Sequence, residues 1–158
     1  MDNVYHRVSH CTIKKNPLIG DGVWSRQAEF PHMAAIGYGT KDVSWLCGGI
    51  IISDSYILTA AHCLYSHDNG PAAKIRVGTK NLADPDSTMQ ERDVVETISH
   101  PEYKVPATYH DIALLKLNKP LDLNPWVRPA CLEIKDKFDD TPFIASGFGT
   151  TSFGKDNI

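Results

Sequence analysis

The chain has 158 residues with 42% hydrophobic and 22% charged content, which suits one globular domain with an ordinary core. Its net charge of -3 at pH 7 excludes a strongly basic nucleic-acid-binding surface. No apolar run approaches the roughly 20 residues that a membrane-spanning helix needs. We therefore expect neither nucleic acid nor a membrane among the partners of this protein.

The first 18 residues are polar and are predicted to form an irregular arm. They contain no apolar core and so do not resemble a signal peptide. The chain nevertheless has an even set of cysteines, which are Cys11, Cys47, Cys63 and Cys131. Such a set predicts two disulfides and an oxidising compartment. Either the thiols are reduced in a cytosolic protein, or the printed chain lacks its true start. We favour the second interpretation and expect a secreted protein.

Three apolar segments in the first half of the chain have the residues that are typical of strands. They are His32–Tyr38, Ile50–Ile52 and Tyr56–Thr59. The small polar run Ser53–Ser55 separates the last two segments and predicts a turn. A hairpin is therefore expected in the middle of the chain.

The hairpin brings Cys47 back beside Cys63, which directly follows His62. If the two cysteines bond, the disulfide holds the backbone that carries His62. A catalytic base needs such a support, because proton transfer requires hydrogen-bond reach of its partner. The alternatives are a structural histidine or a zinc site made of Cys47, His62, Cys63 and His67. Zinc is disfavoured, because adjacent ligands fit a tetrahedron poorly and no C-x-x-C pair occurs, so no metal is expected.

The second half of the chain continues the pattern of short strands separated by turn-rich loops. The expected strands are Lys74–Gly78, Arg92–Ser99, Asp111–Asn118 and Phe143–Gly149, and Leu64–Ala73 is interpreted as a surface loop. Ile112, Leu114 and Leu117 are available to a core. Together the segments make about seven strands and include no amphipathic helix of three turns. The pattern predicts an all-β antiparallel fold, either a sandwich or a barrel.

Two motifs resemble those of a known family. LTAAHC at Leu58–Cys63 and HDIALLKL at His110–Leu117 are similar to motifs of the chymotrypsin/trypsin family of serine endopeptidases. Four further runs occur in the family's order: EFPHMAAIG from Glu29, CGGIIIS from Cys47, VRPACL from Val127 and ASGFGTTSFG from Ala145. The resemblance extends from about Ile19 to the end. It implies an antiparallel β-barrel, the first of the two-barrel trypsin-like fold, plus the start of the second barrel. The EFPHMA run and the cysteine-bearing arm resemble the Snake-like group of arthropod clip-domain proteases.

The resemblance implies catalytic roles for two polar residues. His62 would take the proton of a serine nucleophile. Asp111 would accept a hydrogen bond from the other ring nitrogen, fix the tautomer and stabilise the imidazolium. Without the resemblance, Asp111 would be interpreted as a surface aspartate at the start of a strand. His100 and His110 have no matching role and are interpreted as surface residues.

The family's nucleophile motif, Gly-Asp-Ser-Gly-Gly, does not occur in these residues, and Asp54-Ser55 lacks the glycines. The nucleophile, the oxyanion hole and the primary specificity pocket would therefore lie beyond Ile158, and we expect the chain alone to be inactive. The leading hypothesis is an incomplete chain of a secreted serine endopeptidase zymogen from an extracellular cascade. The alternative is a non-catalytic protease homologue that acts as a binding or decoy protein. A disulfide-stapled β domain unrelated to proteases is disfavoured by the order of the motifs.

The resemblance also implies an activation site. Cleavage would fall between Leu18 and Ile19, which separates an activation or linker arm, 1–18, from a partial protease domain, 19–158. Because leucine precedes the cut, the activating protease should prefer an apolar side chain. The other partners would be protein substrates of the cascade.

Two more expectations follow from the resemblance alone. Cys11 and Cys131 would form the second disulfide beside the Cys47–Cys63 pair. Thr79 stands at the position of the family's calcium-binding glutamate, so calcium is not expected. No other cofactor is expected either.

Overall fold

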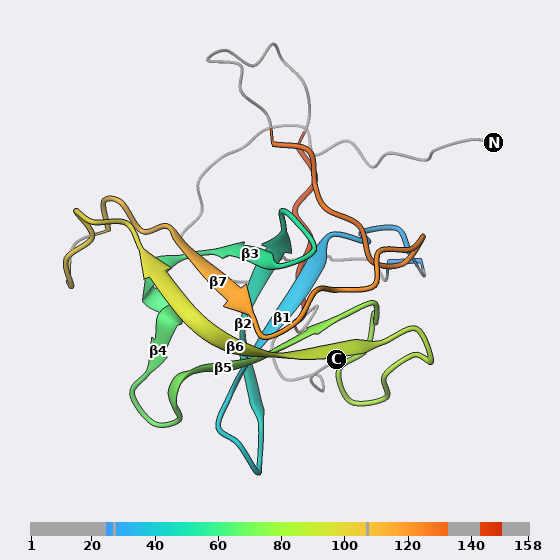
Figure 1. Ribbon diagram of the computed structural model, residues 1–158, viewed down its shortest axis with the longest axis horizontal. Coiled ribbons are helices and arrows are strands. Elements are labelled where there is room, and N and C mark those ends of the chain that lie inside the picture. Colours follow the sequence, from blue (N-terminus) through green and yellow to red (C-terminus); the bar gives the residue numbers. More distant parts are fainter. Residues whose placement is uncertain (1–24, 27, 107, 133–142, 150–158) are drawn as a thin grey trace.

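The computed structural model describes residues 25–26, 28–106, 108–132 and 143–149. Within them it has seven strands and one short 3₁₀ helix, η1 (Figure 1). Their bounds are β1 Met33–Tyr38, β2 Ser44–Ile51, β3 Tyr56–Thr59, η1 Ala61–Leu64, β4 Tyr65–Ser66, β5 Gly70–Val77, β6 Gln90–Ser99 and β7 Ala113–Leu117. None of the helical structure in these ranges is long and apolar enough to cross a membrane.

Six of the strands close into an antiparallel barrel (Figure 1). Hydrogen bonding follows the order β1-β2-β3-β7-β6-β5, and β5 pairs back with β1. The two-residue strand β4 pairs only with the first residues of β5. Closure gives every barrel strand a neighbour on both sides, which removes exposed sheet edges that could pair with another chain. The expected all-β antiparallel barrel is confirmed.

The barrel core is formed by side chains from alternate positions of the strands, because successive residues of a strand point to opposite faces. In β7, Ala113, Leu115 and Leu117 are buried, whereas Leu114 is half-buried. Ile112 lies before the strand and is 47% exposed. The expectation that Ile112 and Leu114 contribute to the core was therefore wrong, since the inward positions are the odd-numbered ones. The fully buried aliphatic side chains are Ile36, Ile51, Ile57, Ile75, Val77, Leu115 and Val127.

The segment Leu64–Ala73 is not a single loop, as the sequence suggested. The helix η1 ends at Leu64, the first residue of this segment. Strand β4 follows directly, and β5 begins at Gly70. Gly70 has a φ of +81°, a conformation that glycine adopts without steric cost. The turn between β4 and β5 is therefore shorter than the surface loop that the sequence predicted.

The expected last strand, Phe143–Gly149, is also absent, because these residues form no ladder in the structure. They lie near β1 instead, where the hydroxyl of Ser146 is 3.3 Å from the sulfur of Met33. Strand β1 already pairs with both β2 and β5. It has no free edge to which a further strand could add.

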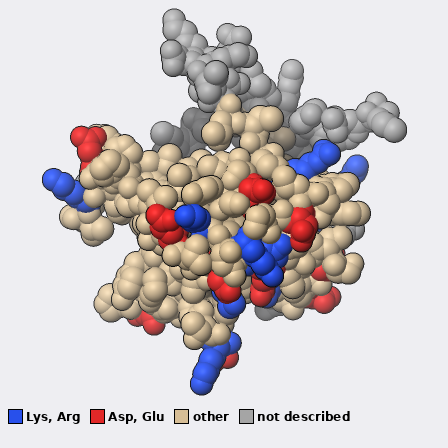
Figure 2. Space-filling model, in the orientation of Figure 1, with Lys and Arg blue, Asp and Glu red and all other residues tan. Residues whose placement is uncertain are grey.

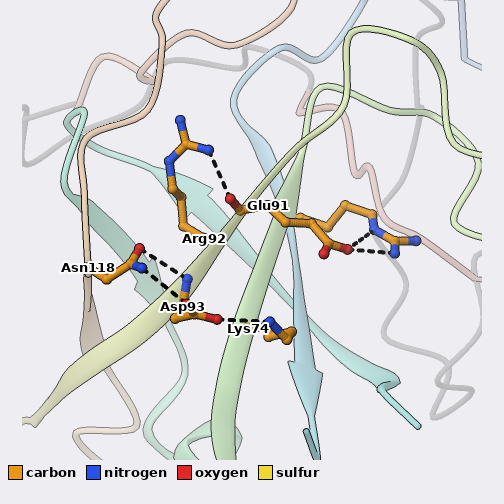
Figure 3. A network of polar contacts seen from close by, with 6 residues as sticks. Lys74, Glu91, Arg92, Asp93 and Asn118 are labelled. Carbon is orange, nitrogen blue, oxygen red and sulfur yellow. Dashed lines mark hydrogen bonds and ion pairs between the residues drawn. The ribbon is translucent and has the colours of Figure 1, made fainter. Parts of the chain in front are cut away.

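Ion pairs connect neighbouring strands on the outside of the barrel. Lys74 Nζ of β5 lies 2.8 Å from the Asp93 carboxylate of β6, and Arg76 Nη2 lies 2.6 Å from the Glu91 carboxylate. The amide of Asn118 also donates to Asp93, at 3.1 Å (Figure 3). The hydrogen bond from Lys74 lowers the pKa of Asp93. Figure 2 shows side chains of both charges interspersed on the face in view, so the described residues form no extended basic patch there.

Candidate active site

His62 lies on η1, which is separated from β3 by one residue, Ala60. The next residue, Cys63, is buried and forms a disulfide with Cys47 of β2, with 6.1 Å between the two Cα atoms. This bond confirms the pair that the predicted hairpin favoured. The carbonyl of Cys63 also accepts a 2.7 Å hydrogen bond from the hydroxyl of Tyr38 in β1. Three neighbouring strands thus hold the short helix that carries His62.

Tyr38 is a contributor that the sequence alone did not reveal. Its side chain is buried in the barrel core, and this burial raises the pKa of its hydroxyl. A buried tyrosine hydroxyl needs a hydrogen-bond partner, and here the partner is the backbone beside His62. The sequence did hold a signal for the burial of Tyr38. It stands two residues after Ile36, so both side chains lie on the inward face of β1.

Asp111 reaches His62 from the segment that precedes β7. Strands β3 and β7 pair with Thr59 opposite Ala113, which brings the flanking residues of both strands side by side. Nδ1 of His62 lies 2.7 Å from Oδ2 of Asp111. The backbone N–H of His62 donates to the other carboxylate oxygen, Oδ1, at 2.8 Å. Both oxygens therefore bind a residue that is 49 positions away in the chain.

These hydrogen bonds determine the charge and the tautomer of the pair. The hydrogen bond from the His62 ring lowers the pKa of Asp111 most, and the hydrogen bond from the His62 backbone lowers it further. Asp111 is therefore a carboxylate at neutral pH and can only accept, so Nδ1 of His62 carries the proton. In the neutral ring, Nε2 is then left with a lone pair. Because 63% of the His62 side chain is exposed, a reacting group can approach this nitrogen. The ring is suited to act as a general base.

The zinc alternative fails because of the disulfide. Cys47, His62 and Cys63 do offer ligand atoms within 4.8 Å of one another. The two sulfurs are bonded to each other, however, and the thiolate is the form of cysteine that binds zinc. His67, the fourth residue of that hypothesis, lies 3.1 Å from Asp68 with its side chain fully exposed.

Ser55 is not placed to serve as a nucleophile for His62. It precedes β3 whereas His62 follows that strand, so the two residues lie at opposite ends of it. The Ser55 hydroxyl donates instead to the carboxylate of Asp54 at 2.8 Å. Within the part of the chain that the structure describes, no hydroxyl or thiol is hydrogen-bonded to the His62 ring.

Comparison with known proteins agrees with the fold. The family model described as Trypsin matches residues 19–158. The chain belongs to the trypsin family. Serine protease snk of Drosophila melanogaster is 41% identical over 143 residues, which cover 87% of this chain and 33% of the relative. CLIP domain-containing serine protease C9 of Anopheles gambiae is 29% identical over 160 residues, which cover 94% of this chain and 42% of the relative.

A solved structure, that of GrC, matches this trypsin-family barrel with a TM-score of 0.62 at 27% identity. The match covers 73% of this chain and 49% of that chain. Within the family, this chain resembles arthropod proteases of the clip-domain type, as the motifs predicted. The chain spans only 33% and 42% of the length of the two curated relatives.

A groove lies beside the pair on the trypsin-family barrel, and Asp111 is among its lining residues. Much of the lining is apolar and comes from Met33, Leu46, Ile50, Ile112, Ile144 and Phe148. Leu46 is 57% exposed and Ile144 is 47% exposed. Apolar side chains that line a concave surface next to polar groups are typical of a binding site.

The loop after Gly78, where the family has its calcium-binding glutamate, is closed by its own hydrogen bonds. The Thr79 hydroxyl donates to the carbonyl of Asn81 at 2.9 Å, and the backbone N–H of Lys80 donates to Asp86 at 3.1 Å. These side chains supply the contacts that hold the loop. That the protein needs no calcium stays a prediction.

Three of the predicted site residues, Cys11, Leu18 and Ile19, lie outside the described residues. Cys131 is exposed and forms no disulfide with any residue in the described ranges. The Cys11–Cys131 bridge and the activation site therefore stay predictions.

Proposed function

We propose that this chain supplies the general base and the orienting carboxylate of a serine endopeptidase. The observation that carries the proposal is the pair of hydrogen bonds from His62 to Asp111, at 2.7 and 2.8 Å. In the reaction, Nε2 of His62 takes the proton of a serine hydroxyl as its oxygen attacks the substrate carbonyl, and returns it to the leaving amine. Asp111 stays ionised, holds the tautomer and stabilises the imidazolium. The serine and the oxyanion donors come from chain outside these 158 residues.

The same proposal places the activity in a secreted zymogen of an extracellular cascade with protein substrates. The similarity to Serine protease snk and to a CLIP domain-containing protease supports it, as does the Cys47–Cys63 disulfide. Residues 1–18 form the activation or linker arm, and 19–158 form part of the protease domain. A Cys11–Cys131 bridge keeps the arm attached after cleavage.

Sequencing the full-length transcript tests this function against the alternative of a non-catalytic binding or decoy protein. A reading frame that continues past Ile158 into a Gly-Asp-Ser-Gly-Gly motif supports the endopeptidase. A stop codon directly after Ile158 supports the binding protein, which would use the exposed groove beside Asp111. The two outcomes exclude each other, so one experiment decides.

We expect the 158 residues, produced alone, to be catalytically inert. A base and its carboxylate accelerate acyl transfer only when a nucleophile and oxyanion donors are held nearby. The measurement is turnover of a panel of peptide esters, together with labelling by a fluorophosphonate probe. Stoichiometric labelling that is lost in His62→Ala would show that a nucleophile exists among these residues and would overturn the prediction.

We expect a chymotrypsin-like protease, but not a trypsin-like one, to cut between Leu18 and Ile19. A leucine side chain fits an apolar specificity pocket, whereas a trypsin-like protease should cut at Lys14 or Lys15. The variant Leu18→Arg is the matched test, because it should transfer the cut at this bond to the trypsin-like protease. N-terminal sequencing of the products identifies each cut. An intact Leu18–Ile19 bond after both digestions would contradict the proposed activation site.

A further inference from the structure

A second cluster of titratable side chains lies in the connection between β6 and β7. The two strands pair with Ser99 opposite Ala113, which brings the residues just beyond the ladder together. The rings of His100 and His110 stack with their centroids 4.7 Å apart and an interplanar angle of 11°. A carboxylate oxygen of Glu102 lies 3.6 Å from Nε2 of His110.

Backbone contacts hold these residues in place. The N–H of His100 donates to the carbonyl of Ile112 at 3.0 Å, and the N–H of Ile112 donates to the carbonyl of His110 at 2.8 Å. The N–H of Glu102 donates to Nδ1 of His100 at 3.2 Å. His110 has a φ of 60°, which a non-glycine residue adopts only when its surroundings enforce it. The hairpin connection therefore determines where the two histidines meet.

Two imidazoles and one carboxylate form a donor set that zinc takes in proteins, with water as the fourth ligand. The ligand atoms of His100, Glu102 and His110 lie within 4.8 Å of one another. Zinc bonds of about 2.0–2.1 Å place tetrahedral ligand atoms roughly 3.3 Å apart. The Glu102–His110 contact of 3.6 Å is close to that spacing. The remaining approach of the ligand atoms requires rotations of these side chains, and those of Glu102 and His110 are exposed.

We propose that His100, Glu102 and His110 form a binding site for Zn²⁺. Calcium and magnesium are not expected there, because both prefer oxygen ligands. His110 is bonded directly to Asp111, so an ion at this site places a double positive charge on the segment that delivers the carboxylate to His62. The proposal revises the expectation that the two histidines have no role and that the chain binds no metal.

The test is a zinc titration of the 158-residue chain by isothermal titration calorimetry at neutral pH. We expect a saturable zinc equivalent and no comparable heat from calcium. Outer-shell changes at metal sites typically cost about 10–100-fold in affinity, so losing a ligand in His100→Ala or Glu102→Gln should cost roughly tenfold or more. His110→Ala should do the same, but its positive φ ties this residue to the fold. The first two variants therefore carry the test.

The matched control is His67→Ala, because His67 also lies 3.1 Å from a carboxylate, that of Asp68, but has no third ligand among the described residues. Cys131→Ser is a second control, because it removes an exposed sulfur that lies outside the three-ligand cluster. Both controls should keep the affinity of the parent. The proposal is overturned if the parent shows no saturable zinc binding, if His100→Ala and Glu102→Gln bind as tightly as the parent, or if either control loses as much affinity.

Discussion

If the chain supplies the base of a serine protease as proposed, replacing His62 by alanine is expected to lower kcat by about 10⁶-fold, since removing the base of a serine protease triad has that effect. Asp111→Asn is expected to lower kcat by about 10⁴-fold, because an asparagine favours the wrong tautomer of the ring. The physical reason lies in the 2.7 Å contact between Nδ1 and Oδ2, which leaves Nε2 free to accept a proton. The measurement is steady-state hydrolysis of a peptide ester by the product of the full-length reading frame.

The chain offers matched controls for both substitutions. His67 and Asp68 also form a histidine–aspartate contact, at 3.1 Å, but both side chains are almost fully exposed on a turn. His67→Ala and Asp68→Asn should therefore leave kcat unchanged. Retention of full activity in either His62→Ala or Asp111→Asn would contradict the proposed roles of the pair.

Removing the Cys47–Cys63 disulfide through Cys47→Ala and Cys63→Ala together is expected to lower the free energy of unfolding by about 3 kcal/mol in the chain-entropy account of crosslinks. The two cysteines are 16 positions apart, and the bond restricts the unfolded chain over that loop. Cys63 is also part of the buried core cluster, so the loss of its sulfur adds lost packing. Urea unfolding measures this change as a shift of the urea concentration at the midpoint. The comparison requires that the free energy of unfolding falls with urea at the same slope in both proteins. An unchanged midpoint would contradict the prediction.

Peptide mapping without reduction is the control for this experiment. The parent should yield one peptide pair linked through Cys47 and Cys63 and a second linked through Cys11 and Cys131. Cys131→Ser leaves the first bridge intact, and its unfolding midpoint measures the second bridge separately. A link from Cys11 to Cys47 or to Cys63 would rule out the proposed pairing.

Local signals predicted the strands where period and residue type agree. Tyr56–Thr59 was predicted with the bounds that β3 has, and the β-branched run Ile50–Ile52 lies largely within β2. Prediction failed where a segment has more than one consistent interpretation. The apolar residues Ile112 and Leu114 suit a core as well as their neighbours do, and only pairing with β3 decides which alternate set points inward. Phe143–Gly149 has a composition typical of a strand, but its neighbour β1 has no free edge.

The sequence by itself determined the antiparallel all-β class, the family and the hairpin that bonds Cys47 to Cys63, because each depends on residue order within a short window or on motifs in series. Only the tertiary structure decided that both oxygens of Asp111 bind His62, and that His100 stacks on His110. These contacts join residues that flank different strands. Their geometry follows from the register between strands and from closure of the barrel. The alternation of apolar and polar residues within one segment specifies neither of them.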